Sequence, residues 1–514
     1  MSIGQKFLTV GGLTIISRLL GVIREAFLSH FLGACAEMDA YLIAFKFPCF
    51  FRKFFAEGGF QSIFVPYFTD FAARGKSKAA QYFSSRIFTA VFWWMLFFSI
   101  VVFIFAKQFV LLMAPGFSSD PEKLALAIEF TRIIFPSVAF VSLSAIYSSV
   151  LIANKRFFAY SLSPILVNII LILSLISCQD IISAGYRISV GVLLAGIFQF
   201  IYLYTIVKSK NLTMPNIGKL KTTPRIRNFF RKLIPVLGGA GVAQVNIFMD
   251  SLFGSFLPTG CIAYIYFADR FVQLPLALFG ISMSTILLPE IAVQIAKGNK
   301  DQIKKTANDA ILFMFRLTMP SVIILITFSY LFISILYGHG KFLEQAVKNT
   351  ADVLKIFSLG LPAYVLAKIL ASVLFAQKDS KTPIIAAICS VISNIVLNAI
   401  LIVPFQEKGI AISTAVSGFV NAYIMYRKSK GYFKFTKDFL NSILKIISSS
   451  IVMWVFIEIS VTFFNFENSS VFSEITFLLI FGVLGFLVYF LFLLCLREEG
   501  ARNVIAFIKK KTER

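Results

Sequence analysis

The sequence predicts an all-α membrane protein that crosses the bilayer many times. Of its 514 residues, 58% are hydrophobic and only 14% are charged, whereas soluble globular proteins carry roughly 25% charged residues. Apolar runs of about eighteen residues or more recur along the chain, and each is long enough to cross a hydrocarbon core about 30 Å thick. The runs do not alternate between apolar and polar residues, so helices satisfy the backbone inside the membrane and a β-barrel is excluded.

We divide the chain into about fourteen spanning helices in three groups. The first six predicted spans cover residues 7–33, 38–70, 84–113, 122–153, 158–178 and 186–207, and the next six cover 226–257, 260–294, 306–337, 346–377, 382–403 and 408–427. The last two cover residues 438–464 and 472–496. The first run is too long for the apolar core of a signal peptide and contains Arg18 and Arg24, so we predict that it is a spanning helix.

A basic linker separates the two six-helix groups. It runs from Lys208 to Lys232 and contains Pro215 and Pro224. We therefore predict an N-lobe of residues 1–222, a C-lobe of residues 223–432, and a C-terminal region of residues 433–514 with two additional helices and a basic tail. Paired helical lobes are a recurrent transporter plan, in which the substrate site lies between the lobes.

The distribution of Lys and Arg orients the spans. The loops after even-numbered spans and the C-terminal tail hold about 30 of the 49 basic residues, whereas the loops after odd-numbered spans hold about six. Because basic loops stay in the cytoplasm, we predict that both termini are cytoplasmic. The net charge of +24 thus reflects membrane topology, and we expect no nucleic-acid partner. The six cysteines include no CxxC pair, so we expect no metal cofactor or disulfide framework.

Charged residues within the predicted spans are the strongest functional signal. An Arg or Lys at the centre of a spanning helix costs roughly 2.5–3.5 kcal/mol, so such residues must face water or one another. The first two spans carry more cations than carboxylates: Arg18, Arg24, Lys46, Arg52 and Lys53 against Glu25, Asp39 and Glu57. Span eight adds Asp269 and Arg270. Internal ion pairs or snorkelling to an interface would explain any one of these residues, but the surplus of cations favours a wet cavity for an anion. A planar guanidinium suits a phosphate or diphosphate, because it donates two parallel hydrogen bonds.

A second polar set lies in the C-lobe spans. It comprises Asp250, Asn394, Asn398 and Thr414. Asn394 and Asn398 are four residues apart and share one helix face. One carboxylate with amide and hydroxyl oxygens fits Na⁺, and ordinary hydrogen bonding between helices is the alternative interpretation.

Catalytic motifs are absent from the sequence. It contains no GxxxxGK[ST] phosphate-binding loop, which excludes ATP hydrolysis by this motif, and neither HExxH nor GxSxG. We therefore predict a transporter and not an enzyme.

Several of these segments closely resemble the MurJ (MviN) family of the MOP exporter superfamily. The resemblance is carried by Ser17–Glu25, Asp39–Pro48, Arg52–Phe60 and Tyr266–Arg270, followed by Leu274 and Pro275. The family flips lipid II, the undecaprenyl-diphosphate-linked peptidoglycan precursor, from the cytoplasmic to the periplasmic leaflet by alternating access. The resemblance therefore implies a lipid II flippase in the bacterial cytoplasmic (inner) membrane, with lipid II and membrane lipids as partners and cell-wall synthesis machinery as a further candidate partner.

The resemblance also implies roles for individual residues. Substrate-cavity roles fall on Arg18, Arg24, Arg52 and Arg270, with Asp39 in the same region. A chloride site falls on Arg24, Glu25 and Arg270, and a sodium site falls on Asp250, Asn394, Asn398, Thr414 and the backbone of Ile410. The sequence departs from the family at Lys53, where Arg is common, and at Gln273, where an acidic residue is frequent.

Three alternatives to lipid II transport remain at this point. One is a flippase for another polyprenyl-diphosphate-linked oligosaccharide, and another is a membrane-embedded cell-wall glycosyltransferase. The third is a non-transporting scaffold, which would not require charges buried in the membrane.

Overall fold

The computed structural model describes residues 3–55, 59–74, 77–177, 182–218, 223–433, 436–463 and 470–502. Glu57, one of the acidic residues singled out in the sequence, lies outside these ranges. All regular secondary structure in the described residues is helical, which confirms the predicted fold class. The chain forms two compact units, residues 1–263 with 339–342 and residues 264–338 with 343–514. The predicted lobe boundaries at residues 222 and 432 follow from counting six spans per lobe, and they stay predictions.

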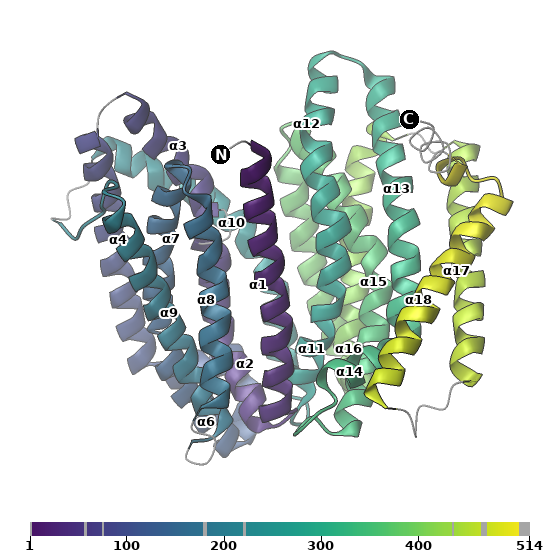
Figure 1. The fold of residues 1–514 in the computed structure, drawn as a ribbon, viewed down its shortest axis with the longest axis horizontal. Helices are drawn as coiled ribbons and strands as arrows, with labels where there is room; N and C mark the ends of the chain where they lie inside the picture. The colour runs from purple at the N-terminus through teal and green to yellow at the C-terminus, as the bar shows by residue number, and fades with distance from the viewer. Residues whose placement is uncertain are drawn as a thin grey trace. The chain divides into compact units, whose positions relative to one another are not determined.

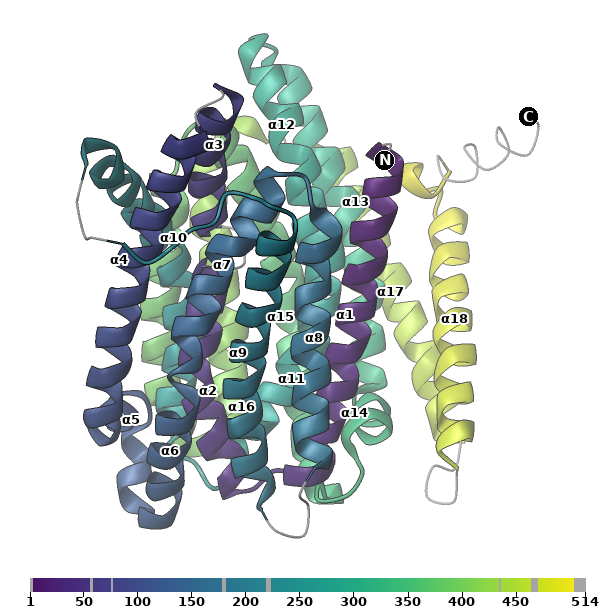
Figure 2. The same cartoon turned by 60° about the vertical axis from the view of Figure 1, so that its left-hand side comes forward.

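The first unit is built from the helices up to α10 (Figures 1 and 2). Their bounds are α1 Ile3–Leu32, α2 Ala36–Phe55, α3 Gly59–Ala73, α4 Ser77–Ile104, α5 Ala106–Met113, η1 Pro115–Ser119, α6 Pro121–Ile134, α7 Ser137–Ala153, α8 Phe157–Ile176, α9 Ala184–Ser209 and α10 Pro224–Gly254. Figures 1 and 2 both show α1 running along α8, and α8 in turn packs on α9. A core of buried aromatic and aliphatic residues, among them Phe60, Phe64 and Phe229, joins α3 and α10.

The second unit contains most of α11 and all later helices. Their bounds are α11 Cys261–Pro275, η2 Leu276–Ile281, α12 Ser282–Ala296, α13 Lys300–Thr327, α14 Ser329–Tyr337, α15 Glu344–Ala376, α16 Lys381–Ser429, η3 Lys430–Tyr432, α17 Lys437–Phe463 and α18 Val471–Cys495. Helices α15 and α16 pack together, and α17 pairs with α18 and contacts α13. Helix α16 contains a break at Gln406, whose φ of 49° and ψ of −128° are not helical. The break falls between the spans predicted at 382–403 and 408–427.

Ten helical segments of the described chain are long and apolar enough to cross a membrane. Large apolar side chains stand exposed on them, for example Phe472 at 80% and Val483 at 61% on α18, as expected for helices that face lipid. The predicted spans 7–33, 38–70 and 226–257, which hold α1, α2, α3 and α10, are not among the ten. The first two of these spans carry the clustered intramembrane charges. The predicted total of fourteen spans stays a prediction.

Two glycines allow a close backbone contact at the end of α1. Gly33 and Gly340 both have positive φ, at 67° and 65°. The Lys341 N–H donates to the His30 carbonyl oxygen at 2.9 Å. A Cβ on Gly33 would lie 2.3 Å from the Lys341 carbonyl oxygen, and a Cβ on Gly340 would lie 2.4 Å from that of His30. This contact explains why residues 339–342, which follow α14, belong to the first unit.

Candidate functional site

Arg24 is held in place by a neighbouring helix. Its Nη1 donates to Oδ1 of Asn168 on α8 at 3.0 Å, and its Nη2 pairs with the carboxylate of Glu25. The amide nitrogen of Asn168 donates to the Ser17 carbonyl oxygen at 3.1 Å. Asn168 therefore bridges the backbone of α1 and the guanidinium of Arg24. Glu25 is buried, whereas the Arg24 side chain remains 16% exposed. The structure thus gives Arg24 the internal ion pair that the sequence left as an alternative, and leaves part of the guanidinium accessible.

The remaining predicted cations of the first unit lie on α1 and α2. Arg18 and Arg52 are exposed. Lys46 Nζ donates to the Ile247 carbonyl oxygen at 3.3 Å, and Lys53 Nζ donates to Oε1 of Gln244 at 3.4 Å. Both lysines therefore contact α10, and the predicted substrate roles of Arg18 and Arg52 stay predictions.

Arg270 belongs to the second unit. It lies on α11, and its guanidinium carbon is 4.3 Å from the ring centroid of Tyr266, a cation–π distance. Gln273, one turn later, donates to Asp269, so this neutral residue still contacts a carboxylate. Of the predicted chloride ligands, the structure brings Arg24 and Glu25 together in the first unit and places Arg270 in the second.

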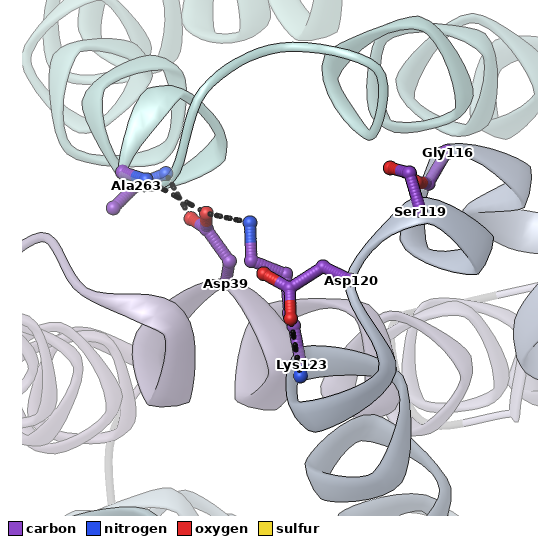
Figure 3. Close-up of polar contacts among 7 residues, drawn as sticks. Asp39, Gly116, Ser119, Asp120, Lys123 and Ala263 are labelled. Atoms are coloured by element: carbon purple, nitrogen blue, oxygen red, sulfur yellow. Dashed lines mark hydrogen bonds and ion pairs between the residues drawn. The ribbon is translucent and has the colours of Figure 1, made fainter.

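Asp39 is enclosed in a polar network (Figure 3). Only 1% of the residue is exposed. Its Oδ2 accepts from the Gly260 N–H at 2.8 Å and lies 3.4 Å from Nζ of Lys123, and its Oδ1 accepts from the Ala263 N–H at 3.2 Å. The carboxylate thereby satisfies two backbone N–H groups at the start of α11, which have no partner within that helix. Asp39 ties α2 to α6 and to the start of α11, and its predicted direct contact with substrate stays a prediction.

The local sequence explains how Lys123 reaches Asp39. Pro121 occupies the first position of α6, and the Asp120 side chain accepts from the Lys123 N–H at 3.0 Å as the helix cap. The fixed φ of proline and the capping carboxylate define where α6 begins. The Lys123 side chain then points at Asp39, and its ammonium also lies 5.0 Å from the Phe117 ring centroid. The sequence does not reveal this pairing, because Asp39 and Lys123 are 84 residues apart in the chain.

The predicted sodium ligands of α16 meet across its break. The Asn398 amide nitrogen donates to Asn394 Oδ1 at 3.0 Å, and the Asn394 amide nitrogen donates to Thr414 Oγ1 at 3.2 Å. Asn394, Asn398 and Ile410 are each 0% exposed. The chain reverses near Gln406, which brings Thr414 back beside Asn394. Asp250, the remaining predicted ligand, lies on α10 in the first unit, and the sodium site stays a prediction.

The structure also shows a buried ion pair that sequence reasoning missed. Arg316 on α13 lies 2.5 Å from Glu498, which is fully buried just beyond α18. The Tyr489 hydroxyl donates to the Arg316 carbonyl oxygen at 3.0 Å, and the Ala501 N–H donates to Glu498 at 2.9 Å. These bonds attach the end of α18 to α13. Nothing in the local sequence distinguishes Glu498 from the neighbouring Glu499.

The chain is similar to proteins of one family over most of its length. The family model described as "Lipid II flippase MurJ" matches residues 28–485. A probable lipid II flippase MurJ of Rickettsia prowazekii is 33% identical over 429 residues, which cover 84% of both chains. A probable lipid II flippase MurJ of Rhizobium meliloti is 33% identical over 478 residues, which cover 91% of this chain and 89% of the relative.

Solved structures show the same relationship. A lipid II flippase MurJ in an inward closed conformation has a TM-score of 0.78 and 29% identity, and the match covers 93% of this chain and 97% of the other. An inward-facing multidrug transporter of the MATE family, from the MOP superfamily, has a TM-score of 0.67 at 12% identity, covering 82% of this chain and 97% of the other. The second likeness shows a common fold alone.

Proposed function

Because the chain belongs to the MurJ family of lipid II flippases, we propose that it moves lipid II from the cytoplasmic to the periplasmic leaflet by alternating access. It is a transporter and not an enzyme. Within the chain, the observation that most supports the proposal is the arginine set in membrane helices, with Arg24 oriented by Asn168 and Glu25. Guanidinium groups held in this way suit the diphosphate that links the precursor to its lipid.

The arginines would bind the diphosphate, and the polyprenyl tail would stay in the bilayer or in a groove of the last two helices. Arg18, Arg24 and Arg52 belong to the first unit and Arg270 to the second. Rearrangement of helical lobes around a fixed site is the usual basis of alternating access. The buried bonds of Asp39 to Lys123 and to the start of α11 would need to break in any state that separates α2 from α11.

We place the protein in the bacterial inner membrane with both termini in the cytoplasm, as its loop charges favour. Cell-wall synthesis enzymes are candidate partners, because they make and consume lipid II.

Two ions are proposed as ligands. Chloride near Arg24, Glu25 and Arg270 would neutralise surplus positive charge. For sodium, the observed amide and hydroxyl oxygens of Asn394, Asn398 and Thr414 fit a hard cation, and the Asp250 carboxylate would supply the compensating charge.

Purified protein in liposomes is expected to move fluorescent lipid II between leaflets. The readout is the fraction of label that a membrane-impermeant reductant quenches as a function of time. Protein-free liposomes and liposomes containing a labelled phospholipid are the controls. Equal rates for lipid II with and without the protein, in correctly folded samples, would contradict the proposed function.

Replacing Asn168 with leucine is expected to lower lipid II flux severalfold without loss of the fold. Leucine has similar size but donates no hydrogen bond to Ser17 and accepts none from Arg24, and a hydrogen bond to a charged group contributes roughly 1.5–3 kcal/mol. We expect weaker apparent lipid II affinity with little change in the maximal rate, because Asn168 acts through Arg24. The matched control is Ser174→Ala, also on α8, whose hydroxyl bonds only its own helix in the described structure. Equal kinetic parameters for Asn168→Leu and the native protein would contradict this role.

Sodium is expected to raise the thermal unfolding midpoint of the native protein above its value in potassium at equal ionic strength. Ligand that binds only the folded state stabilises it by mass action. The difference between the two salts should disappear in Thr414→Val, which keeps side-chain volume and removes the hydroxyl. The control is Ser417→Ala, one turn later on the same helix, whose hydroxyl donates to the Thr414 carbonyl oxygen. An equal midpoint in both salts for the native protein would exclude the sodium site.

A further inference from the structure

The start of α10 borders a basic cavity that the proposed translocation mechanism does not use. The cavity has a volume of about 530 Å³ and is lined by Thr223, Pro224, Arg227, Asn228 and Arg231. All five residues lie in the first unit, in the C-terminal part of the basic linker.

Contacts with α3 fix the orientation of this part of α10. The Arg225 guanidinium carbon lies 5.2 Å from the Phe71 ring centroid, and Lys232 Nζ lies 5.3 Å from that of Tyr67. The amide nitrogen of Asn228 donates to the Tyr67 hydroxyl at 3.3 Å. Three polar residues on one helix face therefore use the aromatic rings of α3.

Because of these contacts, Arg227 and Arg231 point away from the aromatic rings of α3. At about 100° per residue the two arginines lie within about 40° of each other, and they are turned about 160° (Arg227) and about 120° (Arg231) away from Arg225. Both are exposed, and within the described part of the chain neither forms a salt bridge or a cation–π contact. Two guanidinium groups one helical turn apart thus line the same cavity with their donors available.

The sequence of α10 sets the depth of this cavity in the membrane. No charged residue follows Lys232 until Asp250. Ile234 is 67% exposed, so an exposed apolar side chain stands within one turn of Arg231. Cations at the boundary of an apolar segment lie at the level of lipid phosphates, and loop charge assigns this end of α10 to the cytoplasmic side.

We propose that this cavity binds the phosphate of a lipid head group through Arg227 and Arg231. Both arginines can donate paired hydrogen bonds to phosphate oxygens, whereas an ammonium offers only a point charge. Such a phosphate has two sources, an anionic phospholipid such as phosphatidylglycerol or the diphosphate of a polyprenyl carrier. The site does not depend on the Arg24 cluster, which is formed by α1 and α8, and the proposal does not rest on the transport function.

The test uses the full-length protein in detergent micelles, titrated separately with phosphatidylglycerol and with undecaprenyl diphosphate. Native mass spectrometry measures the bound lipid. For the lipid that occupies the site, Arg227→Ala/Arg231→Ala should lower the affinity by on the order of tenfold. Lys208→Ala/Lys210→Ala removes the same charge from the preceding linker end and should change it by less than about twofold. Both arginines are exposed, so the variants are expected to fold, and unchanged thermal unfolding midpoints check this.

The outcomes separate the two lipid sources from a general charge effect. Loss of phosphatidylglycerol binding alone identifies a phospholipid site, loss of diphosphate binding alone identifies a site for the carrier, and loss of both shows that the cavity reads the shared phosphate. Equal loss in the arginine and lysine variants would show that only net charge matters and would overturn the proposal. Unchanged affinity for both lipids in the arginine variant would overturn it as well.

Discussion

Replacing Arg24 with alanine is expected to reduce lipid II flux by on the order of a hundredfold. The change removes a guanidinium whose bonds to Asn168 and Glu25 hold it in a fixed orientation. Charge-assisted bonds of this kind to a phosphate contribute roughly 1.5–3 kcal/mol each. Membrane insertion should not suffer, because loss of a charge makes a spanning helix easier to insert. The measurement is the liposome flux assay, normalised to the amount of folded protein.

Two further variants make the Arg24 result specific. Arg24→Lys keeps the positive charge beside buried Glu25 but loses the planar fork, so we expect an intermediate flux with a native unfolding midpoint. Arg132→Ala removes an exposed arginine of α6 that lies over the Phe103 ring at 5.6 Å, and it should leave flux close to native. Native flux in Arg24→Ala would refute the assignment of Arg24 to the substrate site.

Replacing Asp39 with alanine is expected to destabilise the protein by about 3–5 kcal/mol. The change leaves the ammonium of Lys123 buried without its carboxylate, and removing one partner of a buried ion pair has this typical cost. It also leaves the N–H groups of Gly260 and Ala263 without their acceptor. The measurement is the free energy of unfolding of the purified protein by denaturant titration in micelles.

A double variant and a capping variant test the cause of that loss. Adding Lys123→Met to Asp39→Ala removes the unpaired charge, so part of the lost stability should return as a positive coupling between the two positions. Asp120→Ala removes only the cap of α6 and should cost about 1 kcal/mol. If Asp39→Ala lay within about 1 kcal/mol of the native protein, the buried network would not stabilise this fold.

Asp39 shows where sequence reasoning stopped. Its charge and its place near the start of a membrane helix singled it out, and the family resemblance suggested the substrate cavity. The structure shows that Asp39 is enclosed and has a backbone partner 221 residues away, while its contact with substrate stays a prediction. No local pattern specifies that partner, because a backbone N–H at a helix start looks the same in any sequence.

For Arg24, the sequence identified the residue but not the partner that orients it. The cost of this arginine in the membrane made it a candidate site residue without any structure. The residue that orients it, Asn168, is 144 positions away and sits in a helix that contains no charged residue. A polar amide in an apolar run was the only available signal.

The sequence by itself determined that this protein is a helical membrane transporter. The length of an apolar segment, the free-energy cost of a charge within it and the basic residues of the adjoining loops are properties of short segments, and they act on membrane insertion whatever the rest of the chain does. The sequence also singled out the arginines that we predict to bind substrate, since a cation in an apolar run is conspicuous wherever the run packs. Only the tertiary structure decided which groups face one another: Asn168 against Arg24, Lys123 against Asp39, and Thr414 against Asn394 across the break in α16. Those pairings depend on how helices that are distant in the chain pack together, and packing is a property of the whole chain that no single segment encodes.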